Sequence, residues 1–449
     1  MKKILFLIFI ILASCSKDPL DDIVPIDIDD DITKIENPFK NVISKNYLEP
    51  SYYTKIPYLH TNYDKLYNTY GVALNPFNGT DSPRDAVVID YNRDGYYDLV
   101  HSGTDFQKSF EANIDSTYLD NKWRNKIQFF YGNEKGELTL DVEMSNRYWG
   151  MIHGYKGIVN DFNNDGLPDM LFAGTGWHGN SETNVPPHWL NHEYPTMLLS
   201  SGVGNYEQIN FYELSTNYDH SVSSGDYDND GDVDIIFIDP RTDPNILSEY
   251  PSMKWGRILK NKGNGTFDII DIPASAVYTD RKFSSELVDV NGDGFLDLIL
   301  GGTKKTSSHI LLGDGVDFRN EVIEIPGVPN YDFAMDFAIY DYDKDGDVDI
   351  IVNRIPDQES GSHYEGWYMQ VLRNDNNNFV DVSSSDINNN SKWGGEIWIS
   401  FIDVFDFDND GIDELFNNTI NRGTDNKPHS AWFMPELEWE IINGKFIRK

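Results

Sequence analysis

The chain has 449 residues, and acidic side chains outnumber basic ones so far that the formal net charge is −38. This charge argues against nucleic-acid binding, which needs basic stripes, and against electrostatic adsorption to anionic lipid. Hydrophobic residues make up 39% of the chain and aromatic residues 14%, enough for a large core, so the chain is not a disordered acidic polymer.

Residues 1–14 have the layout of a secretory signal, with two lysines before an apolar run too short to span a bilayer. The run ends in Leu-Ala-Ser-Cys, which resembles a bacterial lipobox. The resemblance implies that Cys15 is lipidated and becomes the mature N-terminus, so that the lipid is the protein's only contact with the membrane. An ordinary cleaved signal with an incidental cysteine is the alternative.

Residues 15–46 are polar and acidic after the cysteine, a composition typical of a flexible tether between lipid and folded domain. The charged residues directly after Cys15 resemble those of Bacteroidetes lipoproteins that reach the cell surface. This resemblance implies a lipid-anchored location at the bacterial outer membrane, exposed at the cell surface.

A nine-residue pattern, D-x-[DN]-x-D-G-x-x-[DE], occurs six times from residue 90 onward. Oxygen atoms at positions one, three and five of a tight loop can converge on one Ca²⁺, and the acid at position nine can complete the shell. Glycine at position six permits a turn that a Cβ would obstruct. Acidic turns without a metal are the alternative. The predicted ligands of up to six Ca²⁺ ions are Asp90, Asn92, Asp94 and Asp98; Asp161, Asn163, Asp165 and Asp169; Asp226, Asp228, Asp230 and Asp234; Asp289, Asn291, Asp293 and Asp297; Asp341, Asp343, Asp345 and Asp349; and Asp406, Asp408, Asp410 and Glu414.

Short apolar runs flank every loop, and each repeat continues with a further pair of such runs around a Gly- or Asn-rich turn. Each repeat therefore predicts four antiparallel strands with the acidic loop between the first two, which is one blade of a β-propeller. This arrangement resembles the FG-GAP/VCBS repeat family of calcium-loop propellers, known from integrin α-subunits, over residues 85–449.

An all-β propeller of four-stranded blades is thus predicted for residues 47–449. Six blades are explicit in the repeats. A seventh is favoured, with residues 47–84 as a blade that lacks an acidic loop; in the six-blade alternative these residues close the ring.

The family resemblance implies that a ligand binds on the face opposite the calcium loops. A long loop of the second repeat carries aromatic and histidine side chains suited to stacking on a sugar, and basic residues follow several second strands, where they could attract an anionic ligand. Local ion pairs are the alternative for the basic residues, and a transition-metal site at His178, His188 and His192 is a further alternative. The ligand-binding candidates are Trp177, His178, Arg241, Lys304, Arg354 and Arg422.

These features favour a non-catalytic surface protein, monomeric or part of a surface complex, that binds a glycan or protein ligand through its propeller. No G-x-S-x-G, H-E-x-x-H or phosphate-loop motif occurs in the sequence. A structural subunit is one alternative. A lyase acting on a uronic-acid polysaccharide is the other, and its candidate catalytic residues are His153, Tyr155, His220 and Arg241.

Overall fold

The computed structural model describes residues 86–94, 96, 98–102, 124–133, 139–151, 154–175, 193–214, 219–239, 256–272, 282–303, 307–356, 366–388, 390–393, 397–405, 411–421 and 439–448. The predicted signal segment, Cys15, the tether and residues 47–84 lie outside these ranges. No helix within them has the length and apolar character that a membrane crossing requires.

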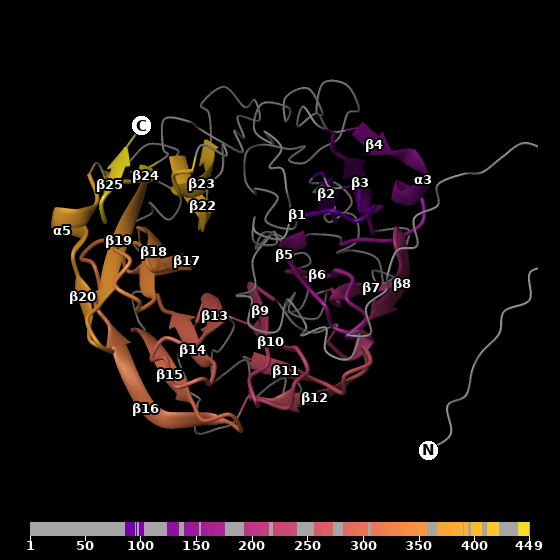
Figure 1. Ribbon diagram of the computed structural model, residues 1–449, viewed down its shortest axis with the longest axis horizontal. Coiled ribbons are helices and arrows are strands. Elements are labelled where there is room, and N and C mark those ends of the chain that lie inside the picture. Colours follow the sequence, from indigo (N-terminus) through magenta and orange to yellow (C-terminus); the bar gives the residue numbers. More distant parts are fainter. Residues whose placement is uncertain are drawn as a thin grey trace, which may run out of the picture. The chain divides into compact units, whose positions relative to one another are not determined.

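Six antiparallel sheets, each built on four consecutive strands, make up the described part of the chain (Figure 1). Blade 1 comprises β1 (Ala86–Ile89), β2 (Asp98–His101), β3 (Gln128–Tyr131) and β4 (Thr139–Asp141), followed by the short helix α3 (Val142–Ser145). Blade 2 comprises β5 (Gly154–Asn160), β6 (Asp169–Gly174), β7 (Thr196–Gly202) and β8 (Asn205–Asn210), followed by the 3₁₀ turn η3 (Tyr212–Leu214). Blade 3 comprises β9 (Ser221–Gly225), β10 (Asp234–Ile238), β11 (Gly256–Asn261) and β12 (Phe267–Asp271).

The second half of the ring repeats this plan. Blade 4 comprises β13 (Ser284–Val288), β14 (Asp297–Gly301), β15 (Ser308–Gly313) and β16 (Phe318–Ile325). Blade 5 comprises β17 (Phe333–Tyr340), β18 (Asp349–Ile355), β19 (Gly366–Asn374) and β20 (Phe379–Asp381), followed by α5 (Ser383–Asp386) and by β21 (Ser391–Trp393), which pairs with β19. Blade 6 comprises β22 (Ile397–Phe405), β23 (Glu414–Asn421), β24 (Trp439–Ile441) and β25 (Phe446–Arg448).

The prediction of an all-β propeller with four-stranded blades is confirmed, and the acidic loop lies between the first and second strand of each blade. The favoured count of seven blades is not supported, because the described residues form six such sheets, one for each repeat. Residues 47–84, the predicted seventh blade, lie outside the described residues.

The first strand of each blade lies nearest the middle of the ring (Figure 1), and consecutive first strands contact one another from β1 through β5, β9, β13 and β17 to β22. The second strand is covered by neighbouring blades on both faces. All five residues of β10 are buried, as are all seven of β18. This burial explains why the second strands read as continuous apolar runs and do not alternate.

The hydrophobic core is divided into layers that lie between adjacent blades. Between blades 2 and 3, for example, Ile158 and Leu171 pack with Val222, Ile235 and Phe237. Similar layers join blade 1 to 2, 3 to 4, 4 to 5 and 5 to 6. Because the apolar surface of each blade is buried by its neighbours, the position of one acidic loop relative to the next is set by these layers.

Candidate metal loops and the opposite end of the inner strands

The first five acidic loops share one backbone conformation, held by the carboxylate at position one. Asp161 accepts hydrogen bonds from the backbone N–H groups of Asp165 (3.1 Å) and Gly166 (2.9 Å). Asp341 accepts the equivalent bonds from Asp345 and Gly346, both at 3.1 Å. Position four is left-handed throughout the first five loops, with φ of 59° at Arg93 and Asn164, 58° at Asn229, 71° at Gly292 and 62° at Lys344.

Glycine at position six is required for its backbone conformation and not for space. The φ of Gly346 is +103°, and a Cβ built there would meet no atom within 4 Å. Gly166 is similar, with φ +80° and open space around it. A Cβ at this position would therefore strain the local backbone, because L-residues with a side chain adopt a positive φ at a cost, and it would meet no more distant atoms.

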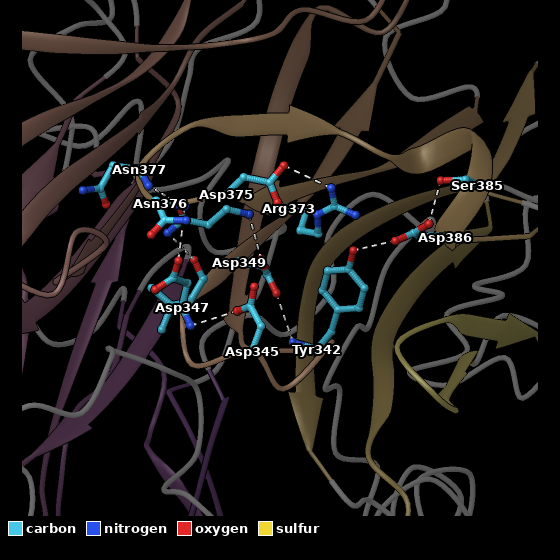
Figure 2. Close-up of polar contacts among 12 residues, drawn as sticks. Tyr342, Asp345, Asp347, Asp349, Arg373, Asp375, Asn376, Asn377, Ser385 and Asp386 are labelled. Atoms are coloured by element: carbon cyan, nitrogen blue, oxygen red, sulfur yellow. Dashed lines mark hydrogen bonds and ion pairs between the residues drawn. The ribbon is translucent and has the colours of Figure 1, made fainter.

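The carboxylate at position nine is a backbone acceptor, a role that the sequence analysis did not assign to it. In the fifth loop Asp349 accepts from the N–H of Tyr342 (3.1 Å) and from the N–H of Asn374 (2.8 Å), the last residue of β19 (Figure 2). One oxygen thus closes the loop and the other joins it to the third strand. The same pair of bonds is made by Asp98, Asp169, Asp234 and Asp297.

These position-nine carboxyl groups are fully buried. Burial raises the pKa of Asp234 to about 8 and that of Asp349 to about 7, although the backbone N–H bonds counteract it. The neighbouring carboxylates of each loop raise both pKa values further. The ionised loop therefore concentrates negative charge where water is excluded, a setting in which a bound cation has its largest stabilising effect.

Two asparagines at the ends of third strands connect the loops of blades 3 and 5 to the preceding blades. Asn261 donates through Nδ2 to the carbonyl of Phe162 in the loop of blade 2 (2.7 Å) and to that of Val233 in its own loop (2.9 Å). Asn374 does the same to Val290 in blade 4 (3.0 Å) and Val348 (3.1 Å). Neither residue belongs to the nine-residue pattern; the signal for them in the sequence is an Asn after the third apolar run, in KNKGNG and RNDNNN.

Among the loops that the structure describes in full, the third and fifth fit a hard divalent cation best. Each presents three carboxylates whose ligand oxygens lie within 4.8 Å of one another: Asp226, Asp228 and Asp230 in one loop, and Asp341, Asp343 and Asp345 in the other. In each trio one buried oxygen, Oδ1 of the position-three aspartate, has no hydrogen-bond partner in the described part of the chain. A buried carboxylate oxygen left in this way is a ready ligand for an ion such as Ca²⁺.

The first, second and fourth loops carry Asn at position three. Here the amide Nδ2 donates to the position-five carboxylate, at 3.0 Å from Asn92 to Asp94, 3.1 Å from Asn163 to Asp165 and 3.2 Å from Asn291 to Asp293. The amide therefore occupies part of the carboxylate that would face an ion. The sequence also leads to the expectation that the lower charge of Asn at position three weakens cation binding relative to the third and fifth loops. The contact agrees with this expectation, which stays a prediction.

In the sixth loop Asp406, Asp408 and Asp410 lie outside the described residues. Glu414 at position nine is buried, and Gly411 has φ +89° as in the other loops. The Asp413 carboxylate accepts a hydrogen bond from the Tyr340 hydroxyl of blade 5. This contact connects blades 5 and 6 beside the loops.

An aromatic cluster lies at the other end of the inner strands, where these strands begin. Ring centroids are 4.1 Å apart between Tyr155 and His220, 3.8 Å between His220 and Phe283, and 4.2 Å between Phe283 and Phe333. The four side chains come from four successive blades and are each less than 10% exposed. The structure thus brings together two of the predicted catalytic candidates, Tyr155 and His220, within a largely apolar cluster.

Arg354, a predicted ligand-binding residue, is 1% exposed and bonded within blades 4 and 5. Its guanidinium donates to Gln370 Oε1 (2.6 Å) and to the carbonyl of Pro326 (3.1 Å). Burial lowers its pKa to about 10, and the charges of Asp332 and Asp381 oppose that shift. The remaining ligand and catalytic candidates lie outside the described residues: His153, Trp177, His178, His188, His192, Arg241, Lys304 and Arg422.

One ion pair connects blades that are not neighbours. Lys156 Nζ of β5 lies 2.7 Å from Glu286 Oε1 of β13, with side chains 11% and 4% exposed. Burial raises the pKa of Glu286 to about 7, the charge of Lys156 opposes this, and Asp336 and Asp403 add to it. The inner strands of blades 2, 4, 5 and 6 therefore bring one ammonium and three carboxylates into mutual range.

The chain has distant likenesses to several solved structures. The crystal structure of the V. cholerae biofilm matrix protein Bap1 matches at 12% identity and a TM-score of 0.32, over 72% of this chain and 42% of that chain. A chain from BBS1N in complex with ARL6DN matches at 9% identity and a TM-score of 0.36, over 77% of this chain and 92% of that chain. A thermostable family-43 glycoside hydrolase matches at 10% identity and a TM-score of 0.35, over 84% of this chain and 95% of that chain.

The chain spans less than half the length of the Bap1 chain. No curated protein matches it by sequence. The FG-GAP-like repeat model matches at two places, each of which begins at position one of an acidic loop and ends within the second strand of the next blade. Residues 161–237 and 289–352 are therefore FG-GAP-like repeats, as the spacing of the acidic loops indicates.

Proposed function

We propose that this protein is a calcium-stabilised β-propeller, anchored by lipid at the bacterial cell surface, that binds a glycan or protein ligand on the face opposite its acidic loops. The observation that carries the proposal is the construction of the loops. Their carboxylates bond to the backbone of their own blade, and the loop carbonyls accept bonds from the next blade. Ions held there would stabilise the ring and leave the other face for recognition.

Calcium is the ion that the donor set favours, because all the donors are oxygens and the loops provide several carboxylates each. In this proposal the ion is held by positions one, three and five of each loop. It supplies positive charge that offsets the repulsion among the loop carboxylates and the burial of the position-nine acid. Removal of the ion is expected to lower the melting temperature of the protein, which differential scanning calorimetry with and without chelator measures.

Ligand recognition is testable on an array of anionic and neutral glycans, screened with calcium and with chelator. We expect binding in calcium that is lost with Trp177→Ala. The control is Tyr131→Ala, because Tyr131 is 40% exposed at the end of β3 that faces the acidic loops. Glycan binding that survives Trp177→Ala, or that Tyr131→Ala removes equally, would contradict the proposed face.

The lipid anchor is tested separately. Cells that express the full chain are fed a clickable fatty acid, and label is expected on the wild-type protein and not on Cys15→Ser. Protease treatment of intact cells then distinguishes a surface-exposed from an enclosed propeller. Equal labelling of both chains would contradict lipidation at Cys15.

A polysaccharide lyase is the second candidate function, favoured by the contact between Tyr155 and His220. A lyase needs a base that removes a proton next to the uronate and a cation that neutralises the carboxylate. Uronic-acid polysaccharides incubated with the protein would then give an unsaturated product that absorbs in the ultraviolet. We expect this absorbance to disappear in His220→Asn if the lyase function holds, and no absorbance over a broad substrate panel counts against it.

A further inference from the structure

The third and fifth loops are nearly identical in sequence. They read DYDNDGDVD and DYDKDGDVD, and their one difference is at position four, where the fifth loop has the exposed Lys344 in place of Asn229. Both present three converging carboxylates, and both contain a buried position-three oxygen that has no hydrogen-bond partner among the described residues. From the loops alone, similar affinities for a divalent cation follow.

The two loops differ in the basic residue that the third strand of the blade places beside them. Lys260 is the residue before Asn261, at the end of β11, and its ammonium forms ion pairs with two of the loop carboxylates. It contacts Asp228 directly and lies 3.5 Å from Asp230 Oδ2. Asp228 is 8% exposed and Lys260 37%, so the lysine reaches from the surface to a carboxylate that is otherwise buried.

Blade 5 has Arg373 at the position equivalent to Lys260, one residue before Asn374. Its guanidinium bonds to both oxygens of Asp375, at 2.8 and 3.0 Å, and this pair lies beside the fifth loop (Figure 2). A planar guanidinium matches a carboxylate with two parallel bonds, so Asp375 holds it on its own hairpin.

In blade 3 the residue after Asn261 is Lys262, where blade 5 has Asp375. Lys262 pairs with Asp268 across its own hairpin at 2.5 Å. The hairpin therefore offers Lys260 no carboxylate at the position of Asp375, and the ammonium turns to the loop.

We propose that Lys260 acts as a built-in cation of the third loop, so that this loop binds Ca²⁺ more weakly than the fifth despite the same carboxylates. The inference rests on the proposed calcium binding, and it adds that the fifth loop binds calcium at lower concentrations than the third. A divalent ion that enters the third loop has to displace the ammonium from Asp228 and Asp230. On the third strand beside the fifth loop, Arg373 is bonded to Asp375 and acts on Asp343 by its charge without forming an ion pair with it, so the fifth loop fills first as calcium rises.

The consequence is that the two loops respond to calcium over different concentration ranges. Two unit charges about 4 Å apart near a protein surface interact strongly enough to change an affinity by about tenfold or more. The third loop also remains partly neutralised without an ion. Blade 3 therefore keeps its loop conformation at calcium concentrations where the fifth loop depends on the metal.

The test is a set of calcium titrations by isothermal calorimetry on the full chain. Asp228→Asn converts the third loop, and Asp343→Asn the fifth, to the weaker Asn-containing kind, and the difference of each from wild type reports the affinity of that loop. We expect the fifth loop to be at least about tenfold tighter than the third in the wild-type protein. This comparison needs no substitution of Lys260.

The second arm compares Lys260→Gln with the matched control Arg373→Gln. Lys260→Gln is expected to raise the calcium affinity of the third loop about tenfold or more, and to lower the melting temperature in chelator because the carboxylates lose their neutralising charge. Arg373→Gln is expected to change the affinity of the fifth loop by less than about threefold, since its partner is Asp375.

The outcomes separate the two proposals. A third loop as tight as the fifth, or an affinity unchanged or lowered by Lys260→Gln, overturns the role of Lys260 and leaves calcium binding standing. Titrations that Asp228→Asn and Asp343→Asn do not alter contradict calcium binding at these loops, and with it the proposed stabilising role of the metal.

Discussion

At the scale of single residues, the acidic side chains at positions one and nine of the pattern have different structural roles. Position one bonds to the backbone ahead of it, as Asp341 does to Asp345 and Gly346. Position nine bonds to two backbone N–H groups and is buried, as Asp349 is. The repeated acid pattern therefore folds the loop through its backbone bonds, and this contribution is separate from the proposed metal binding.

The first prediction concerns Gly346. Gly346→Ala is expected to lower the free energy of unfolding by about 1–2 kcal/mol, because φ is +103° and a Cβ there costs backbone strain even with open space around it. Gly327→Ala is the matched control, since its Cβ also meets nothing and its φ is not in the left-handed region. Urea denaturation measures both. Equal effects of the two substitutions would show that the backbone conformation is not the cause.

The second prediction concerns Asp349. Asp349→Asn replaces an acceptor with an amide N–H that faces a backbone donor, so a loss of about 2–3 kcal/mol in the free energy of unfolding is expected. The loss should appear in chelator as well as in calcium, because the bonds to Tyr342 and Asn374 need no ion. A loss confined to calcium would mean that Asp349 acts only as a metal ligand. Asp375→Asn, at an exposed pair, serves as the control.

At the scale of elements, the β-hairpin formed by the third and fourth strands of one blade connects to the loop of the preceding blade. Asn261 illustrates how this works: its backbone N–H bonds to Asp234, and its side chain bonds to carbonyls in two different blades. The apolar layers hold the faces of the blades together, and these polar contacts hold the ends that carry the loops. Loop conformation and blade packing are therefore coupled.

The third prediction tests this coupling with two asparagines of one hairpin. Asn261→Ala leaves the carbonyls of Phe162 and Val233 without their donor in a buried site, and the expected loss in the free energy of unfolding is about 2–4 kcal/mol. Asn264→Ala is the control, since Asn264 is exposed and, among the described residues, bonds only to Thr266. Chemical denaturation at saturating calcium measures both. Similar losses for the two variants would contradict the connecting role of Asn261.

At the scale of the whole molecule, charged side chains lie on the inner strands as well as in the acidic loops. The ion pair between Lys156 and Glu286 joins blades 2 and 4, and the carboxylates of Asp336 and Asp403 influence the same site. Within the described part of the chain, the ammonium of Lys156 therefore lies in range of the carboxylates of Glu286, Asp336 and Asp403 in a buried setting. The protonation state of Glu286 follows from this imbalance and from its burial.

The fourth prediction is a pH dependence of stability. Burial raises the pKa of Glu286 from its ordinary 4.5 to about 7, so the folded state favours the protonated form. The stabilising contribution is fully present below about pH 4.5 and is lost as the pH rises through about 7. Glu286→Gln removes this titration, so its melting temperature relative to wild type is expected to rise from pH 5 to pH 8. Both proteins are measured at saturating calcium, and a difference independent of pH would contradict the assignment.

Residues close together in the chain determine the parts of this protein that sequence reasoning predicted. The spacing of DYDKDGDVD and its relatives determines which oxygens can converge, and the apolar runs around each loop determine four strands per blade. Six acidic loops, an all-β propeller and the FG-GAP-like repeats follow from this local information. Local spacing could not predict the backbone role of Asp349, because one of its two donors, Asn374, lies in another strand.

Contacts between segments that are distant in the sequence determine the surroundings of the candidate site residues and the partners of the charged side chains. Three such contacts join residues from different strands or blades: Arg354 with Gln370, Tyr155 with His220, and Lys156 with Glu286. Lys260 and Arg373 occupy equivalent positions, yet one pairs with the loop and the other with its own hairpin. A charged side chain pairs with whichever opposite charge the packed blades bring within reach, and that distance exists only after the blades assemble.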